Sequence, residues 1–169
     1  MPANYVGGGA YAMNDAGMVV GYVSDTNDVI HPAVWDATGH LSVLDQGGQS
    51  AGMALTINNN GIIGGWIGSN SEPQKEYAVV WNNGTLTPVG NSGNAYCSLL
   101  NINNQAVVNM YNGEGSPVLY YQNTATPLGN ANWLFNAARA INNQAAIVGN
   151  AVDTQGNDLT YLWQNGTYL

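Results

Sequence analysis

A short pattern that recurs about every 42 residues places the strongest constraint on the fold of this chain. In each copy an apolar residue is followed by asparagine, then by two or three polar or small residues, and then by a run rich in β-branched residues. The asparagines are Asn14, Asn58, Asn103 and Asn142, and they lie 44, 45 and 39 residues apart. The copy at 54–65, ALTINNNGIIGG, has asparagines and a glycine between two short apolar runs, which predicts a tight turn joining two strands.

Each copy continues with signals for two more strands. An alternating apolar segment ends at an aromatic residue, and a turn and a last short strand follow it. We assign these aromatic anchors to the structural core: Trp35, Trp81, Tyr121 and Trp163. No stretch shows a convincing 3.6-residue period, so helix is expected to be scarce. The chain is therefore interpreted as one all-β domain of four units, approximately 1–45, 46–90, 91–129 and 130–169.

A four-stranded meander repeated at this period is typical of a β-propeller blade. A single meander leaves apolar surface exposed, and stacking one blade against the next buries it. We predict a β-propeller of four four-stranded blades. The alternative is half of an eight-bladed ring formed by two chains. Self-association into a homo-oligomer is expected because the outer strands lack the lysines that discourage edge pairing.

The residue three positions after each repeat asparagine predicts the type of turn. Gly17 and Gly61 occupy this position in the first two copies and accommodate a left-handed backbone. Ala106 and Ala145 occupy it in the third and fourth copies. Because alanine is strained in that conformation, the last two turns are predicted to be of another type.

The charge balance excludes some classes of partner. The chain has two basic residues, Lys75 and Arg139, against ten acids, giving a formal net charge of −8. Electrostatic binding to nucleic acid or to an anionic membrane needs basic clusters, which this chain lacks. No apolar run is long enough for a transmembrane helix, and the first residues, MPANYVGGG, have none of the features of a signal peptide. The single cysteine, Cys97, lies in an apolar run and is expected to be a buried thiol.

The repeat resembles the extracellular HAF repeats. The resemblance rests on Ile-Asn-x-x-Gly-x-Ile-Val-Gly, followed by a strand with tryptophan and by Asn-Gly-Thr-Leu-Thr-Pro-Leu-Gly. The family is named after a His-Ala-Phe triplet that ends two residues before this tryptophan. Residues 31–35 keep the histidine and the tryptophan, and residues 77–81 keep the alanine and the tryptophan. Residues 159–163 keep an aromatic residue and the tryptophan, whereas 117–121 keep neither the triplet nor the tryptophan. The resemblance implies a secreted or surface-exposed bacterial protein of propeller type, and it carries no catalytic site.

Four residues outside the repeat are candidates for ligand binding. Trp66 and Trp133 have no counterpart in the other units, and Phe135 lies beside Trp133. Such aromatic residues near loops serve as stacking platforms or partner anchors, although incidental packing also explains them. Arg139 lies where the other units have mostly apolar residues, so it is a candidate for holding an anion or carboxylate. Its alternative role is structural, in a pair with carbonyls or a neighbouring acid.

Two loops are weak candidates for calcium binding. They contain the pairs Asp25 and Asp28, and Asp153 and Asp158, with asparagine or glycine close by. Neither loop has the complete alternating spacing with a bidentate acid at its end. An ordinary hairpin turn is the favoured interpretation of both loops, and no other cofactor is predicted.

The sequence favours interaction over catalysis. His31 and His40 flank one hairpin without a repeated acid or nucleophile, and the sequence has no Gly-x-Ser-x-Gly, no His-Glu-x-x-His and no phosphate-binding glycine loop. We therefore expect a non-catalytic binding or scaffold module, extracellular or on the cell surface. It would bind a protein, itself or a glycan through loop aromatics and loops rich in Asn and Gln. The alternatives are a polysaccharide lyase or hydrolase using Arg139 and loop acids at a channel mouth, and a structural subunit of a filament or surface layer.

Overall fold

A computed structural model describes residues 4–69, 75–93, 95–110, 116–122 and 124–169. These residues form sixteen strands and no helix, which confirms the all-β prediction. The strands make four antiparallel sheets of four, each in simple sequential order. In the first sheet they are β1 (Tyr5–Met13), β2 (Val19–Asp25), β3 (Ile30–Trp35) and β4 (Leu41–Val43). In the second they are β5 (Ala51–Ile57), β6 (Ile63–Gly68), β7 (Glu76–Asn82) and β8 (Thr85–Gly93).

The third and fourth sheets complete the repeat. In the third sheet the strands are β9 (Ala95–Leu100), β10 (Ala106–Met110), β11 (Val118–Tyr121) and β12 (Thr124–Pro127). In the fourth they are β13 (Trp133–Ile141), β14 (Ile147–Asp153), β15 (Asp158–Gln164) and β16 (Thr167–Tyr168). Each expected unit thus supplies one sheet, although the boundary expected at residue 90 falls inside β8.

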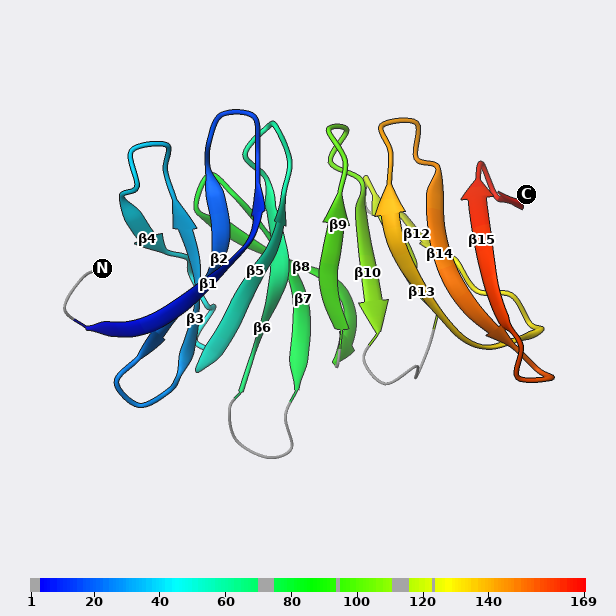
Figure 1. The fold of residues 1–169 in the computed structure, drawn as a ribbon, viewed down its shortest axis with the longest axis horizontal. Helices are drawn as coiled ribbons and strands as arrows, with labels where there is room; N and C mark the ends of the chain where they lie inside the picture. Colours follow the sequence, from blue (N-terminus) through cyan, green and yellow to red (C-terminus); the bar gives the residue numbers. More distant parts are fainter. Residues whose placement is uncertain (1–3, 70–74, 94, 111–115, 123) are drawn as a thin grey trace.

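The four sheets stand in a row (Figure 1), with the first and the fourth at opposite ends. Neighbouring sheets touch through their strands, as β3 does with β5, β6 with β9 and β10 with β13. The predicted closure of four blades into a ring is not confirmed by this arrangement.

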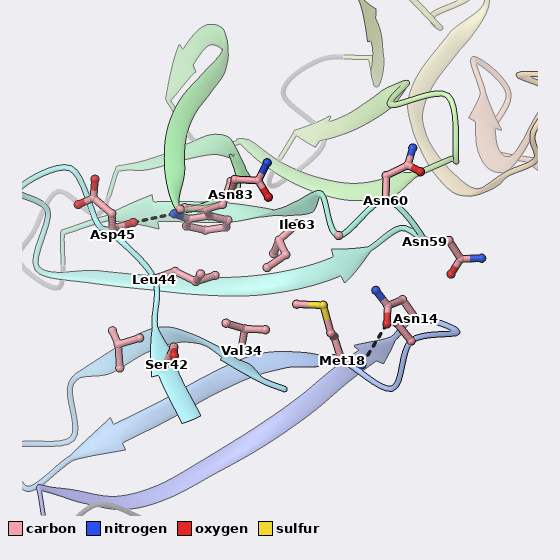
Figure 2. Close-up of a pocket in the computed structure, with 15 residues that line it drawn as sticks. Asn14, Met18, Val34, Ser42, Leu44, Asp45, Asn59, Asn60, Ile63 and Asn83 are labelled. Carbon is pink, nitrogen blue, oxygen red and sulfur yellow. Dashed lines mark hydrogen bonds between the residues drawn. The ribbon is translucent and has the colours of Figure 1, made fainter. Parts of the chain in front are cut away.

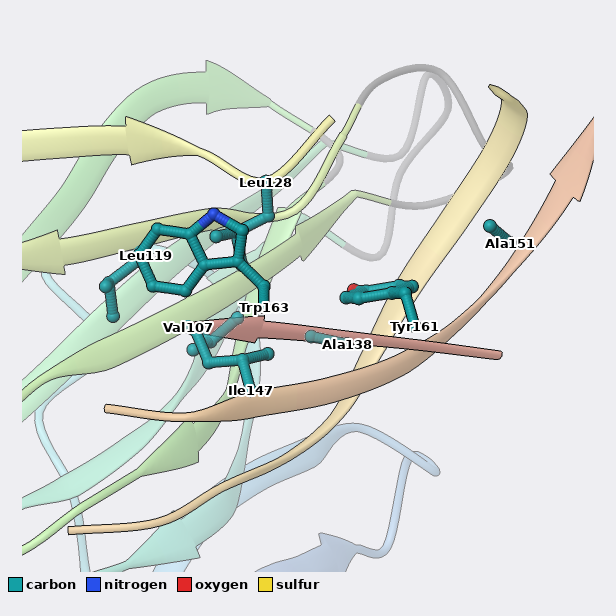
Figure 3. Close-up of a cluster of buried hydrophobic side chains, with 8 residues drawn as sticks. All are labelled: Val107, Leu119, Leu128, Ala138, Ile147, Ala151, Tyr161 and Trp163. Carbon is teal, nitrogen blue, oxygen red and sulfur yellow. The ribbon is translucent and has the colours of Figure 1, made fainter. Parts of the chain in front are cut away.

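Opposite faces of the two middle sheets pack against different neighbours, because side chains alternate along a strand, while the first and fourth sheets each pack through one face. In the first sheet Val20 and Val34 pack on the second sheet, whose Ile63 and Trp81 point back at them. Figure 3 shows the same arrangement at the last interface, where Trp163 of the fourth sheet lies against the third. Among the predicted anchors, Trp81 and Trp163 are buried, at 1% and 7% exposure, while Trp35 is half-buried.

The predicted repeat frame is wrong in the third unit. The residue equivalent to Asn14, Asn58 and Asn142 is Asn101 and not Asn103, because only Asn101 accepts hydrogen bonds in the same way from its own turn. The aromatic anchor is likewise Tyr120, which pairs with Ala106 as Trp81 pairs with Ile63. Tyr121 is therefore not part of the core, and it is 40% exposed.

All four repeat turns share one backbone conformation, contrary to the prediction for the last two. Gly17, Gly61, Asn104 and Ala145 have φ values of 78°, 76°, 62° and 58°. Each lies three residues after its repeat asparagine once the third unit is placed correctly. Ala145 is held in this conformation by two bonds of the turn: its own N–H donates to Asn142 O, and the Asn142 N–H donates to Ala146 O.

The repeat asparagines link each sheet to the next. Asn14 Nδ2 donates to Asn58 O (3.2 Å), Asn58 Nδ2 to Asn101 O (2.9 Å), and Asn101 Nδ2 to Asn142 O (3.0 Å). The side-chain oxygen of each asparagine meanwhile accepts backbone N–H groups of its own turn, such as Ile62 N–H on Asn58 Oδ1. The three donors are 6%, 5% and 3% exposed, so these bonds lie inside the stack. We call this series the asparagine ladder.

Replacing Ala145 by glycine is expected to raise the free energy of unfolding by about 1 kcal/mol. The left-handed conformation costs an alanine roughly 1–2 kcal/mol, and the greater freedom of glycine in the unfolded chain offsets only part of that gain. Urea unfolding of Ala145→Gly beside Ala146→Gly provides the comparison. Equal destabilisation by both changes would contradict the strain assigned to Ala145.

Replacing Asn58 by aspartate tests the ladder separately from the turn. The carboxylate still accepts the N–H groups of the turn, but it no longer donates to Asn101 O and is itself buried. The expected loss of stability is about 2 kcal/mol or more. Asn142→Asp is the matched control, because Asn142 caps the equivalent turn of the fourth sheet but is exposed. In dilute solution its urea unfolding should match the wild type; a similar loss in both variants would argue against the ladder.

Candidate functional site

A groove of about 760 Å³ lies between the first and second sheets and is the best candidate for a binding site. Both sheets line it, with Ser42 and Asp45 from the first and Asn59, Asn60 and Asn83 from the second. Figure 2 shows these side chains around a central group of apolar residues. Its volume falls within the range typical of small-molecule sites.

The floor of the groove is part of the core shared by the two sheets. It consists of Met18, Val34, Leu44 and Ile63, which belong to the same hydrophobic cluster. Trp81 stands behind this floor at 1% exposure, so its ring is not available for stacking with a ligand. Its indole Nε1–H donates to Asp45 O (2.7 Å) and so fixes the chain that follows β4. The groove therefore has a rigid aliphatic floor.

The rim of the groove is polar and almost uncharged. Asn59 exchanges two bonds with Asp15, accepting from its N–H at 3.0 Å and donating to its carboxylate at 2.6 Å. Asn60 Nδ2 donates to Ile102 O, which leaves Asn60 Oδ1 without a bond among the described residues. The Asn83 amide has no bond to the described part of the chain either, and Asn83 stands in a hairpin turn at φ 48°. These amides and the Ser42 hydroxyl both donate and accept hydrogen bonds.

A smaller groove of about 320 Å³ occupies the corresponding place between the second and third sheets. Val80 lines it as Val34 lines the first groove, and Asn104 and Gln122 contribute amides. Tyr121 also lines it and is 40% exposed, so this groove has an accessible aromatic ring. The sequence pattern assigns Tyr121 to the buried anchors and therefore does not predict this role. The two-residue spacing between Tyr121 and Thr124, the same as in the Asn-Gly hairpins, is the signal that could have found it.

The predicted ligand-binding residues do not lie together in either groove. Trp66 is 7% exposed and belongs to the core. Trp133 packs against the rings of Tyr161 and Tyr168, with centroids 5.0 and 4.9 Å away. Arg139 is exposed, and its Nε donates to Asn150 Oδ1 (3.1 Å). The side chain of Phe135 lies outside the described residues.

Tyr161, which packs against Trp133, has a raised pKa. Burial, and after it the neighbouring Tyr168, raise the pKa of Tyr161 to about 12, while Arg139 acts in the opposite direction. Tyr161 therefore stays protonated at neutral pH. Cys97 is fully buried as predicted, and burial raises the pKa of its thiol to about 12, so it is not a nucleophile in the native state.

The predicted calcium-loop acids mostly serve their own turns. Asp25 Oδ1 accepts the N–H groups of Asn27 and Val29, and its other oxygen lies 3.3 Å from His31 Nε2. Asp153 accepts from Gln155, and Asn157 donates to it through both backbone and side chain. Asp28 lies in the turn between β2 and β3, at φ 59°, and Asp158 begins β15. Over the described ranges no three His, Cys, Asp or Glu side chains come together in a way that could hold a metal ion.

The groove carries little that could act as an acid or base. Asp45 is the one carboxylate among the described residues that line the larger groove, and glycoside hydrolysis ordinarily uses a pair. His31 pairs with Asp25 and with Gln46 Oε1 (2.9 Å) on the first sheet, away from the groove lining. The described part of the chain contains no helix that could cross a membrane.

Comparison of the chain with protein-family models, with curated proteins and with solved structures found no match in any of the three. The resemblance to HAF repeats therefore stays a prediction.

The Asp153 carboxyl is expected to titrate below its ordinary pKa of 3.8, because the Asn157 side chain and backbone N–H groups of the turn stabilise its charged form. A lowered pKa means that the turn is stabilised above pH 3.8 and loses this stabilisation as the pH falls through the native pKa. NMR titration of the carboxyl carbon in native and urea-unfolded protein measures both values. A native pKa equal to or above the unfolded one would contradict the capping role.

Proposed function

We propose that this protein is a non-catalytic binding module that holds a neutral glycan in the groove between its first two sheets. The observation that carries the proposal is the composition of that groove. An aliphatic floor lies beneath exposed amides and a hydroxyl, from Asn60, Asn83 and Ser42, with one carboxylate at the edge.

The chemistry of this rim fits sugar hydroxyls better than charged ligands. Hydroxyl groups donate and accept at once, as primary amides do, so each Asn side chain can bind them in two directions. The aliphatic floor suits the C–H faces of a sugar ring. Neither lysine nor arginine is among the described lining residues, and the chain carries a net charge of −8, so sulfated or phosphorylated glycans are disfavoured.

The second groove supports a polymeric ligand. It repeats the first groove one sheet further along and adds the exposed Tyr121 ring as a surface on which a sugar can stack. A polysaccharide whose units repeat could occupy both grooves at once. Occupying two weak sites with one chain raises the overall affinity well above that of either site.

The cellular location of the protein and the larger architecture of its sheets are part of the same proposal. We place the protein outside the cell or on its surface, supported by the resemblance to HAF repeats and by a sequence rich in amide side chains and poor in charged ones. The row of sheets is proposed to be an arc of a propeller-type ring, supported by the regular stacking of its four-stranded sheets.

A glycan array followed by titration calorimetry on the strongest neutral ligand tests the proposal. Asn83→Asp keeps a residue suited to the left-handed turn but removes two donors and adds a charge. The affinity is expected to fall about tenfold, which corresponds to about 1.4 kcal/mol for one lost ligand contact. Asn165→Asp is the matched control, because Asn165 has the same turn conformation, with φ 50°, in the fourth sheet. The proposal fails if no neutral glycan binds or if both variants lose affinity equally.

A further inference from the structure

The two ends of the row expose faces that are buried everywhere else in the molecule. At one end is the outward face of the first sheet near its repeat turn, with Met13, Val19 and Trp35, which we call the head face. At the other end is the outward face of the fourth sheet, with Ala140, Val148 and Leu162, which we call the tail face.

The head face has the residues of an internal docking face. Its counterparts by strand register are Ile57, Ile63 and Trp81 in the second sheet, and Ile141, Ile147 and Trp163 in the fourth. These two sets pack against the preceding sheet, and Ile63 and Ile147 are 4% and 0% exposed. Met13, in contrast, is 68% exposed, and Val19 and Trp35 line an open apolar hollow of about 180 Å³.

The tail face matches the surfaces on which those residues pack. Its counterparts are Ala12, Val20 and Val34 in the first sheet and Leu99, Val107 and Leu119 in the third. Val20 and Val107 are both fully buried by the sheet that follows. Val148, at the same register position, is 41% exposed because none of the described strands packs over it. The apolar parts of the two end faces are thus the two halves of an interface that the molecule builds three times internally.

The asparagine ladder ends with an unused donor at the tail and an unused acceptor site at the head. Asn142 is exposed, and its Nδ2 has no hydrogen bond within the described ranges, whereas the three earlier asparagines donate to the next sheet. The backbone oxygens of Asn58, Asn101 and Asn142 each accept both a ladder donor and an N–H of their own turn. The oxygen of Asn14 accepts only Gly17 N–H among the described groups.

A second series of bonds has the same direction. Asp15 N–H donates to Asn59 Oδ1, and Ile102 N–H donates to Asn143 Oδ1 in the following sheet. By the same register, Asn143 N–H at the tail would meet Asp15 Oδ1 at the head of another molecule, because among the described residues only Asp15 Oδ2 accepts a bond, from Asn59 Nδ2. The tail therefore presents donors where the head presents acceptors.

We propose that a second copy of this chain binds head to tail, with the tail face of one molecule packed on the head face of the other and the Asn142 amide donating to Asn14 O. The apolar match and the unused ladder groups both identify the partner as this same chain. Such an interface is heterologous, so it either closes into a ring or grows into a filament, depending on the rotation between copies. This inference does not rest on the proposed glycan groove, because none of the six residues that define the two end faces lines it, although Asn14 borders both.

Sedimentation velocity over concentrations up to about 1 mM tests the proposal with one variant at each end. Asn142→Asp removes the tail donor and places a carboxylate opposite Asn14 O and Asp15, while it keeps the cap of its turn. Met13→Asp places a charge on the exposed part of the head face. Each variant alone is expected to associate at least tenfold more weakly than the wild type. Circular dichroism and urea unfolding in dilute solution show whether each variant keeps the native fold.

Mixing the two variants distinguishes this geometry from any other self-association. Each variant retains the face that the other has lost, so an equimolar mixture should form a one-to-one heterodimer that neither variant forms alone. Asn165→Asp, which lies on neither end face, should associate like the wild type. The proposal is overturned by a wild-type chain that stays monomeric, by variants that associate normally, or by a mixture that stays monomeric.

Discussion

The stack depends on one primary amide in each repeat turn. The oxygen of that amide accepts N–H groups of its own turn, and its nitrogen donates to the backbone of the next sheet. Local turn formation and packing between sheets are therefore coupled through a single side chain. Aspartate can perform the first task but not the second, since an ionised carboxylate only accepts hydrogen bonds.

The distribution of asparagine and aspartate in this chain follows that distinction. Asp25, Asp36 and Asp153 each accept two backbone N–H groups from the residues two and four positions ahead, which is how the repeat asparagines cap their turns. Within the described part of the chain those three turns make no ladder bond, and acids suffice there. Where a donor toward the neighbouring sheet is also needed, the residue is Asn. The low charge of the repeat core is thus a consequence of how the sheets are joined.

Much of the architecture was predictable from the spacing of short apolar runs and turn residues. Sheet number, strand number and the burial of Trp81 and Trp163 follow from it. The frame of the third unit was not, because Asn101, Asn103 and Asn104 lie close together, and the pair Ile102-Asn103 imitates the repeat better than Leu100-Asn101 does. The pairing of Tyr121 with Thr124 resolves this ambiguity. The error moved the predicted anchor by one residue, from one face of the sheet to the other.

The candidate site was much less predictable. Aromatic residues that interrupt a repeat attract attention, yet Trp66 is buried and Trp133 packs within the fourth sheet. The groove forms instead from ordinary turn residues such as Asn60 and Asn83, which meet only because two sheets stand side by side. Distances between side chains of different units depend on the stacking geometry, and no pattern within one unit encodes them.

Because each sheet makes its main contacts with its immediate neighbours, the gene for such a protein could change length by whole units with little disturbance to the rest. An added unit would bring its own capped turn, its own link to the sheet beside it and one more crevice on the surface. Duplication and loss of units would then adjust how many sites a molecule offers, while the chemistry of each site could drift separately.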